Sequence, residues 1–186
     1  FLRAEEAAYL VLSVRKENGK IIIYGDYDAD GIMGTSILVK MFAYNDYKVD
    51  YYIPNRYQDG YGLTLKHAQE YVDAKYDLVI CVDNGIGAYE PIKLLKDNGV
   101  KVLVLDHHQA QDTLPVADEI LHPQVSKFSS VASSGAFVAF MFSMTFLGRF
   151  DKYLSTLAAI STLTDMMPLK ETNRNLLRLV FKHYEE

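Results

Sequence analysis

Residues 21–37, IIIYGDYDADGIMGTSI, decide the fold. Three isoleucines and Tyr24 form a short apolar run, which is typical of a buried strand. The run then breaks into acids at alternate positions: Asp26, Asp28 and Asp30. We expect Gly31 to close this turn, and small and hydroxyl residues at 34–36 predict the start of a helix. Strand, acidic turn and helix in this order indicate the first unit of an α/β sheet.

The acidic turn also predicts a metal site. Like charges this close together on one tight turn repel each other unless a cation neutralises them. Divalent cations such as magnesium and calcium prefer carboxylate oxygens, so a metal ion is the simplest partner. A solvated acidic loop is the alternative interpretation.

The rest of the chain alternates strands and helices. Strands are expected at 21–24, 49–53, 78–82, 101–105 and 119–121. Helices are expected at 34–45, 63–74, 88–98, 134–147, 151–163 and 173–184, after an amphipathic N-terminal helix that ends at Asn18-Gly19. This alternation predicts an α/β fold, with a Rossmann-like open, mainly parallel sheet flanked by helices and a helical C-terminal part. We expect residues 1–186 to form a single domain.

Composition indicates a soluble globular protein, with 49% hydrophobic and 23% charged residues. The lone Cys81 lies in an apolar stretch and is expected in the core, and a single cysteine fits a reducing compartment, here the cytoplasm. The segment 128–148 carries no charge but holds many hydroxyl groups, so we expect a buried helix and no membrane association. The formal net charge of −5 argues against a generic nucleic-acid patch, although two bound divalent ions would bring it to about −1.

Carboxylates follow three of the predicted strands. The acidic turn follows the first strand, Asp83 follows the strand at 78–82, and Asp106 follows the strand at 101–105. Because the carboxyl ends of parallel strands share one edge of a sheet, we expect these side chains to converge where open α/β sheets bind ligands. One strand-ending Asp is more often a helix cap, but capping does not account well for all of them.

Two histidines, His107 and His108, directly follow Asp106. Adjacent side chains leaving a strand point in different directions, so one ring is expected to bind a metal and the other to orient a ligand or meet a phosphate. Mixed carboxylate and imidazole ligands favour manganese or magnesium over zinc. A two-metal site of this kind predicts hydrolysis of a phosphate ester by an activated water.

The motifs GDYDADG, VDNGI and DHH, in this order at strand ends, resemble the DHH phosphoesterase superfamily. Three further segments resemble its RecJ branch, the single-strand-specific DNA exonucleases: YIPNRYQDGYGL at 52–63, TLPVADEILHP at 113–123 and TDMMPLKETNRNLLR at 164–178. The sequence departs from the family pattern at Tyr24, at His122-Pro123 and at SSGAF.

The resemblance implies roles for individual residues. The implied metal ligands are Asp28, Asp30, Asp83, Asp106, His107 and Asp165, and Asp83, His107 and His108 are the implied catalytic residues. The implied substrate or phosphate contacts are Arg56, Asn84, His108, Ser134, Gly135 and Arg174. Ser134 fits a helix cap equally well, and each arginine fits a surface ion pair. Tyr57 and Tyr61 are candidates for stacking on bases, or for packing their own loop onto the sheet.

The resemblance also implies an activity. It predicts 5′→3′ hydrolysis of single-stranded DNA to mononucleotides in DNA repair and recombination, with two divalent ions, manganese preferred and magnesium possible. Expected partners are single-stranded DNA and a single-strand-binding protein or helicase. The helix from about residue 173 is expected to lead into a DHH-associated domain that this chain lacks. Two alternatives stay open: a phosphodiesterase for short oligonucleotides or cyclic dinucleotides, and a non-catalytic DHH scaffold that binds nucleic acid.

Overall fold

The computed structural model describes residues 3–127 and 132–184. Its five strands form one parallel sheet in the order β2-β1-β3-β4-β5. The strands are β1 Ile21–Tyr24, β2 Asp50–Tyr52, β3 Leu78–Val82, β4 Lys101–Leu105 and β5 Glu119–Leu121. The predicted fold class is confirmed, because β-branched runs buried on both faces pair in parallel, with helices between successive strands except between β4 and β5.

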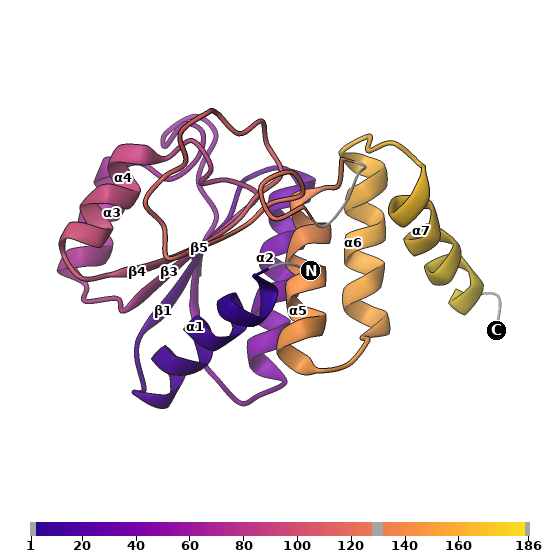
Figure 1. Cartoon of the computed structure of the whole chain (residues 1–186), viewed down its shortest axis with the longest axis horizontal. Helices are drawn as coiled ribbons and strands as arrows, with labels where there is room; N and C mark the ends of the chain where they lie inside the picture. Colours follow the sequence, from indigo (N-terminus) through magenta and orange to yellow (C-terminus); the bar gives the residue numbers. More distant parts are fainter. Residues whose placement is uncertain (1–2, 128–131, 185–186) are drawn as a thin grey trace.

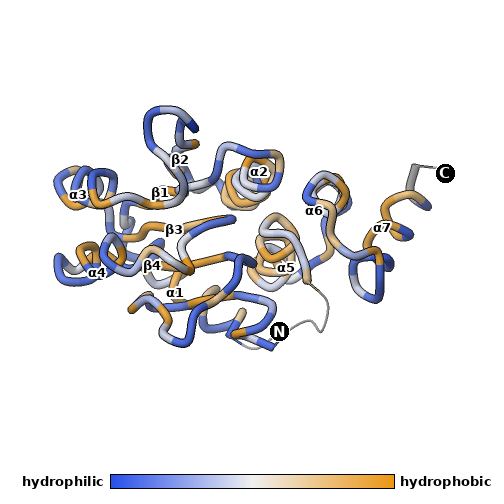
Figure 2. Tube along the Cα trace, turned by 90° about the horizontal axis from the view of Figure 1, so that it is seen from above, coloured by the Kyte–Doolittle hydropathy of each residue, from blue (hydrophilic) through white to orange (hydrophobic). Residues whose placement is uncertain are grey.

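Helices cover both faces of the sheet (Figures 1 and 2). The helices α3 and α4 lie on one face, whereas α1, α2 and α5 lie on the other, and α6 and α7 stack further outward from α5. The bounds are α1 Ala4–Lys16, α2 Ala29–Ala43, α3 Leu65–Asp73, α4 Tyr89–Asp97, α5 Gly135–Leu147, α6 Lys152–Thr164 and α7 Glu171–Tyr184.

Side chains alternate between two cores along each strand. In β3, Leu78, Ile80 and Val82 face the larger core under α1, α2 and α5. Val79 and Cys81 face the smaller core under α3 and α4. Cys81 is a free, fully buried thiol, and burial raises its pKa, so it is a core residue as expected.

The predicted start of α2 is wrong. The helix begins at Ala29, five residues before the expected position, because the Asp28 carboxylate accepts a hydrogen bond from Gly31 N at 2.9 Å and caps it. Gly34 lies inside the helix, where a Cβ atom would come within 2.7 Å of Val82. Gly34 therefore allows α2 to pack closely against β3. Because the helix begins at Ala29, Asp30 lies in its first turn.

The other predicted elements match the structure within about two residues at each end. The uncharged segment forms α5, whose side chains are mostly buried against α2, α6 and the sheet. The beginning of that segment, residues 128–131, lies outside the described residues. Within the described ranges, none of the helices has both the length and the apolar character needed to span a bilayer.

Candidate metal centre

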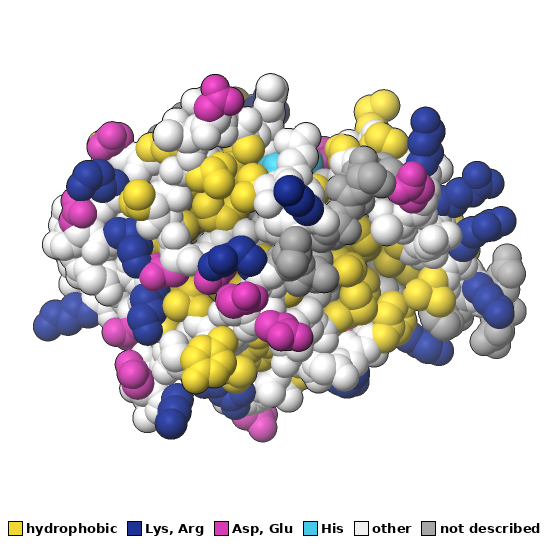
Figure 3. All heavy atoms as spheres, in the orientation of Figure 1, with side chains coloured by type: hydrophobic (Ala, Val, Ile, Leu, Met, Phe, Trp, Pro, Cys, Tyr) yellow, Lys and Arg dark blue, Asp and Glu magenta, His cyan; other side chains and the backbone are white. Residues whose placement is uncertain are grey.

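The carboxyl ends of the strands form one polar edge, as predicted. Asp83 directly follows β3, Asp106 follows β4 and His122 follows β5. All three side chains are at most 1% exposed. In the space-filling view, histidine side chains reach the surface beside an acidic side chain at this end of the molecule (Figure 3).

His107 is the central ligand candidate. Its Nε2 atom lies 3.1 Å from Asp83 Oδ1, 3.4 Å from Asp30 Oδ2 and 3.7 Å from Asp165 Oδ2. These carboxylates come from three separate regions of the chain. The predicted convergence is therefore confirmed for the acidic turn and Asp83, and Asp165 from the end of α6 joins them.

Three overlapping sets of side chains have ligand atoms within 4.8 Å of one another. They are Asp83 with His107 and His108, Asp30 with His107 and Asp165, and Asp26 with Asp28 and Asp83. Asp83 and His107 each belong to two sets. Shared ligands between neighbouring sets are what a two-metal site requires, since one carboxylate can contact both ions.

Asp83 is held in a strained and costly position. Its backbone has a φ of 61°, in the left-handed region that non-glycine residues rarely adopt. Burial raises its pKa to about 11, with the charges of Asp30 and Asp28 adding to the effect. Its Oδ1 atom is buried without a hydrogen-bond partner among the described residues. A bound cation would stabilise the ionised form of this buried and unpartnered carboxylate.

Asp30 is oriented by α5 and α6. Its carboxylate accepts hydrogen bonds from the backbone N–H groups of Gly135 at 2.6 Å and Ala136 at 2.7 Å, and from the Ser161 hydroxyl at 2.5 Å. Ser134 caps α5 by accepting from Phe137 N. The N-terminus of α5 is therefore directed at Asp30, and the phosphate contacts predicted for Ser134 and Gly135 stay predictions.

Gly135 has a second, steric role beside Asp83. A Cβ atom at this position would lie 2.6 Å from Asp83 Oδ1 and 2.9 Å from Asp83 Cα. Only a residue without a side chain lets α5 approach the metal centre this closely.

Asp165 lies at the C-cap of α6, where the helix dipole disfavours a negative charge. Burial raises its pKa, and the charge of Asp30 raises it further. Its Oδ2 atom has no hydrogen-bond partner in the described part of the chain. This position is unfavourable for a carboxylate unless a cation lies against it.

The donor set fits divalent metal ions. Carboxylate oxygens of Asp83 and Asp165 that lack a hydrogen-bond partner among the described residues lie near His107 Nε2. The ion pairs that described Lys and Arg residues form involve neither of these carboxylates. Carboxylate and imidazole ligands without thiolates suit manganese or magnesium. The structural evidence thus agrees with the metal chemistry expected from the sequence.

Asp106 and His108 form a separate pair. Asp106 Oδ1 accepts from His108 Nδ1 at 2.8 Å, and its Oδ2 accepts from Ile86 N at 2.9 Å. Burial alone would raise the pKa of Asp106, but these hydrogen bonds outweigh it and lower the pKa. The same bond raises the pKa of His108. Asp106 belongs to none of the three ligand sets, so its predicted metal role stays a prediction.

The backbone of His108 is also fixed. The buried His122 lies with Nε2 2.6 Å from the carbonyl oxygen of His108, while its Nδ1 accepts from Gln124 N. Burial lowers the pKa of His122, which fits a neutral ring that donates through Nε2. His122 therefore positions His108 through its backbone and belongs to none of the three ligand sets itself.

The remaining predicted contacts lie in different surroundings. Asn84 is fully buried and donates to the carbonyl oxygens of Tyr24, Gly25 and Val82, so it ties the end of β1 to β3. Arg56 is exposed, with its guanidinium 5.7 Å from the ring centre of Tyr27 in the acidic turn.

Arg174 lies on the exposed side of α7, beside the buried Asn173. Asn173 donates to the carbonyl oxygens of Ala132 and Pro168, which anchors α7 near the start of α5.

The loop at 55–62 borders the metal centre. Tyr57 is 93% exposed, whereas the Tyr61 hydroxyl lies 3.0 Å from His108 Nε2. Asp59 anchors the loop by accepting from Tyr52 OH and Asn55 N, each at 2.8 Å. Beside it lies a pocket of about 260 Å³, lined by Tyr61, Gly62, Leu63, Gly85, Ile86, Gly87, Ala88, Asp106, His108 and Gln109.

Three residues of this site had no individual role predicted from the sequence. Asp26 belongs to a ligand set, and its place in the acidic turn already indicated a metal site there. His122 was marked only as a departure from the family pattern. Ser161 carried no signal, because its partner Asp30 is 131 positions away in the sequence.

The model of the DHH family, N-terminal domain, matches residues 20–167. The chain belongs to the DHH family. The single-stranded-DNA-specific exonuclease RecJ of Haemophilus influenzae is 33% identical over 202 residues, an alignment that covers 96% of this chain and 35% of that protein.

Solved structures agree with this DHH assignment. A crystal structure of exonuclease RecJ bound to manganese superposes with a TM-score of 0.89 at 34% identity, covering 97% of this chain and 48% of that one. RecJ from Thermus thermophilus in complex with Mg²⁺ gives a TM-score of 0.66 at 28% identity, covering 95% of this chain and 22% of that one. The predicted resemblance is confirmed, and this DHH domain spans less than half of each of these three proteins.

Proposed function

We propose that this DHH domain hydrolyses single-stranded DNA from the 5′ end, releasing mononucleotides with the help of two divalent ions, manganese preferred. The coarser activity, that of a DHH-family phosphoesterase domain related to RecJ, follows from the family match and the relatives. The observation that carries the proposal is the set of overlapping ligand groups that share Asp83 and His107.

We propose that the metal ligands are the members of the three ligand sets other than His108: Asp26, Asp28, Asp30, Asp83, His107 and Asp165. When bound, divalent ions would supply Lewis-acid stabilisation of the phosphoryl charge and a more acidic water. The protein's own contribution is to hold Asp30 and Asp83 in fixed orientations and to keep their carboxylates largely dry.

His108 is suited to protonate the leaving group. Its hydrogen bond to Asp106 raises its pKa, which favours the protonated ring. Attack of water on phosphorus forms a new P–O bond and breaks the bond to the 3′ oxygen of the terminal nucleotide. His108 would donate its proton to that oxygen, as a general acid does.

The pocket of about 260 Å³ beside His108 is the proposed place for the terminal nucleotide. Its walls include the Tyr61 ring and the apolar Leu63, Ile86 and Ala88, which suit a base and its sugar. A pocket of this size supports removal of one nucleotide at a time.

The chemistry is tested by manganese-dependent release of mononucleotides from 5′-labelled single-stranded DNA. We expect release by the wild type, at least 100-fold less release by Asp83→Ala, and normal release by Asp97→Ala, an exposed acid on α4. A matched duplex should be spared. Cleavage of only di- or trinucleotides would favour the short-substrate alternative, and metal binding without any cleavage would favour a scaffold.

The pocket assignment is tested by filling it. A Cβ atom at Gly87 meets nothing within 4 Å, so Gly87→Val should fold and narrow the pocket. We expect KM for a single-stranded substrate to rise at least five-fold while manganese affinity is unchanged. Ala74→Val, on the exposed end of α3, is the control. An unchanged KM would show that this pocket does not bind the terminal nucleotide.

We extend the proposal to the cellular setting. A role in DNA repair and recombination in the cytoplasm, with a single-strand-binding protein or helicase as partner, is supported by the similarity to RecJ. The chain spans only 35% of that relative, which leaves room for further domains in a related full-length protein. Co-purification of such partners with the complete protein would test the setting.

A further inference from the structure

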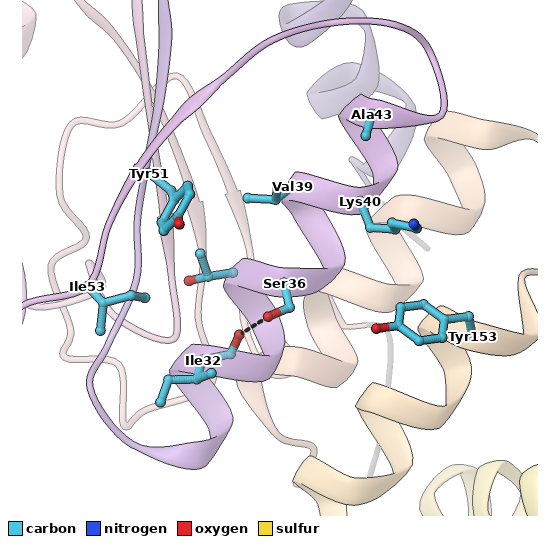
Figure 4. A pocket seen from close by; sticks show the side chains of 9 residues that line it. Ile32, Ser36, Val39, Lys40, Ala43, Tyr51, Ile53 and Tyr153 are labelled. Carbon is cyan, nitrogen blue, oxygen red and sulfur yellow. Dashed lines mark hydrogen bonds between the residues drawn. The ribbon is translucent and has the colours of Figure 1, made fainter.

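The outer face of α2 forms the floor of a groove of about 330 Å³, whose lining includes none of the proposed metal ligands (Figure 4). Its floor residues are Ile32, Thr35, Ser36, Val39, Lys40 and Ala43. Tyr51 and Ile53, from and next to the edge strand β2, lie on one side of α2, and Tyr153 of α6 lies on the other (Figure 4).

Two exposed tyrosines wall this groove, which we call the α2 groove. Tyr51 is 61% exposed and Tyr153 is 56% exposed. The remaining lining mixes the apolar Ile32, Val39, Ala43 and Ile53 with the polar Thr35, Ser36 and Lys40. Exposed rings on both sides of this mixed floor offer stacking surfaces to the faces of unpaired bases.

Cations accompany the aromatic rings. Lys40 Nζ lies 5.8 Å from the ring centre of Tyr153 and 5.5 Å from that of Tyr44, and Arg149 lies 5.2 Å from Tyr44. Aromatic rings with interleaved cations match the bases and phosphates of a single strand.

The nearby acids are already engaged. Asp50 of β2 accepts a hydrogen bond from Tyr76 OH at 2.7 Å. Asp151 caps α6 by accepting from Leu154 N at 3.0 Å and lies 3.7 Å from Arg149. The ion pair with Arg149 offsets the charge of Asp151, while Asp50 is turned to the Tyr76 hydroxyl.

The α2 groove begins next to the metal centre. Ile32, at its near end, donates from its backbone N–H to the carbonyl oxygen of Asp28, the N-cap of α2. Ile53, also in its lining, leads into the loop that carries Arg56, which lies over Tyr27 of the acidic turn. A strand crossing the metal centre would therefore meet a cation–aromatic pair and then the groove.

We propose that the α2 groove binds the uncut part of a single DNA strand, on the 3′ side of the bond that is cleaved. The proposal rests on the exonuclease function proposed above. From Ile32 to Tyr44 the helix and its cap span about 18 Å. This length accommodates about five stacked nucleotides at 3.4 Å each. Bases lie between Tyr51 and Tyr153, and phosphates meet Lys40.

The test compares substrates that do and do not reach the groove. With manganese, we expect Tyr51→Ala and Tyr153→Ala to raise KM for dT12 about ten-fold, leaving kcat and the KM for dT3 within two-fold of wild type. Tyr9→Ala, a 77% exposed tyrosine on α1, is the matched control and should change nothing.

Binding is measured separately from cleavage, by anisotropy of 3′-fluorescein dT12 in EDTA. The tyrosine variants should bind about ten-fold more weakly than wild type. Lys40→Gln should reduce the slope of log Kd against log salt by about 0.7, whereas Lys66→Gln on α3 should not. If wild type fails to bind dT12, or the groove variants bind it equally well, the groove assignment is wrong even if cleavage occurs.

A different occupant would also be visible. If Tyr51→Ala changes the sedimentation of the protein and leaves dT12 binding intact, the groove is a contact between copies of the chain. Loss of all cleavage with dT12 binding still dependent on Tyr51 and Tyr153 would instead refute the proposed catalysis and keep the groove.

Discussion

At the residue scale, the metal centre depends on side chains that hold its ligands as well as on the ligands. Asp30 accepts three hydrogen bonds, from Gly135, Ala136 and Ser161. These bonds fix the orientation of its carboxylate, and groups that orient metal ligands typically contribute 10–100-fold to metal affinity.

Ser161→Ala should therefore weaken manganese binding about ten-fold without unfolding the protein. Isothermal titration would measure the affinity. Ser155→Ala is the matched control, because Ser155 is also buried on α6 but donates to the Lys152 carbonyl. Equal affinities for the two variants would contradict the role given to Ser161.

Asp83 gives the metal-free protein a defined pH dependence. Its pKa is about 11 in the folded chain, against about 3.9 when unfolded. Between these values the folded state holds the proton more tightly, so this group's contribution to stability is present at low pH and declines as pH rises.

We expect Asp83→Asn, which mimics the neutral carboxyl, to remove the loss of stability that Asp83 causes as pH rises. In EDTA, the Tm of wild type should fall relative to the variant between pH 5 and pH 9. With manganese at pH 8, the Tm of wild type should instead exceed that of Asp83→Asn, since only wild type has the Asp83 ligand. Thermal melts with and without metal would measure both effects, and parallel Tm–pH curves in EDTA would refute the prediction.

At the element scale, Asp28 combines two roles that can be separated. It caps α2 through Gly31 N and belongs to a ligand set with Asp26 and Asp83. Serine can also cap a helix, but offers no carboxylate.

Asp28→Ser should keep the metal-free stability of wild type, whereas Asp28→Ala should lose about 1 kcal/mol. Both should weaken manganese binding, because both lack the carboxylate. Chemical denaturation and titration calorimetry on the pair would measure the two effects. Full metal affinity in Asp28→Ser would show that Asp28 serves only as a cap.

At the scale of the whole molecule, the metal centre joins the sheet to the C-terminal helices. Asp83 and His107 follow β3 and β4, Asp30 lies on α2, and Asp165 ends α6. Bound ions would therefore clamp three layers of the fold together.

Manganese at about 100 times its Kd should stabilise the fold by about 2.7 kcal/mol. For a chain of this length, Tm should rise by roughly 5–10 °C. Hydrogen exchange should slow at residues 158–166 as well as at 81–86. In Asp165→Asn, manganese should slow hydrogen exchange only at residues 81–86. Equal protection of both regions in that variant would argue against the clamp.

The sequence by itself determined the sheet and the list of acids. Short apolar runs such as IIIY and LVICV are typical of strands buried on both faces, and these two strands were predicted to the residue. The same runs placed Asp83 and Asp106 at one edge, because parallel strands share their carboxyl ends.

Only the tertiary structure decided what each polar residue touches. The hydrogen bonds to Asp30 from the α5 N-terminus and from Ser161, and the support of His108 by His122, join residues 105, 131 and 14 positions apart respectively. The start of α2, by contrast, depends on a cap between residues 3 positions apart, which a local pattern can reveal. The physical reason is that periodicity and propensity report local burial, whereas the partner of a buried polar group is set by which helices pack together.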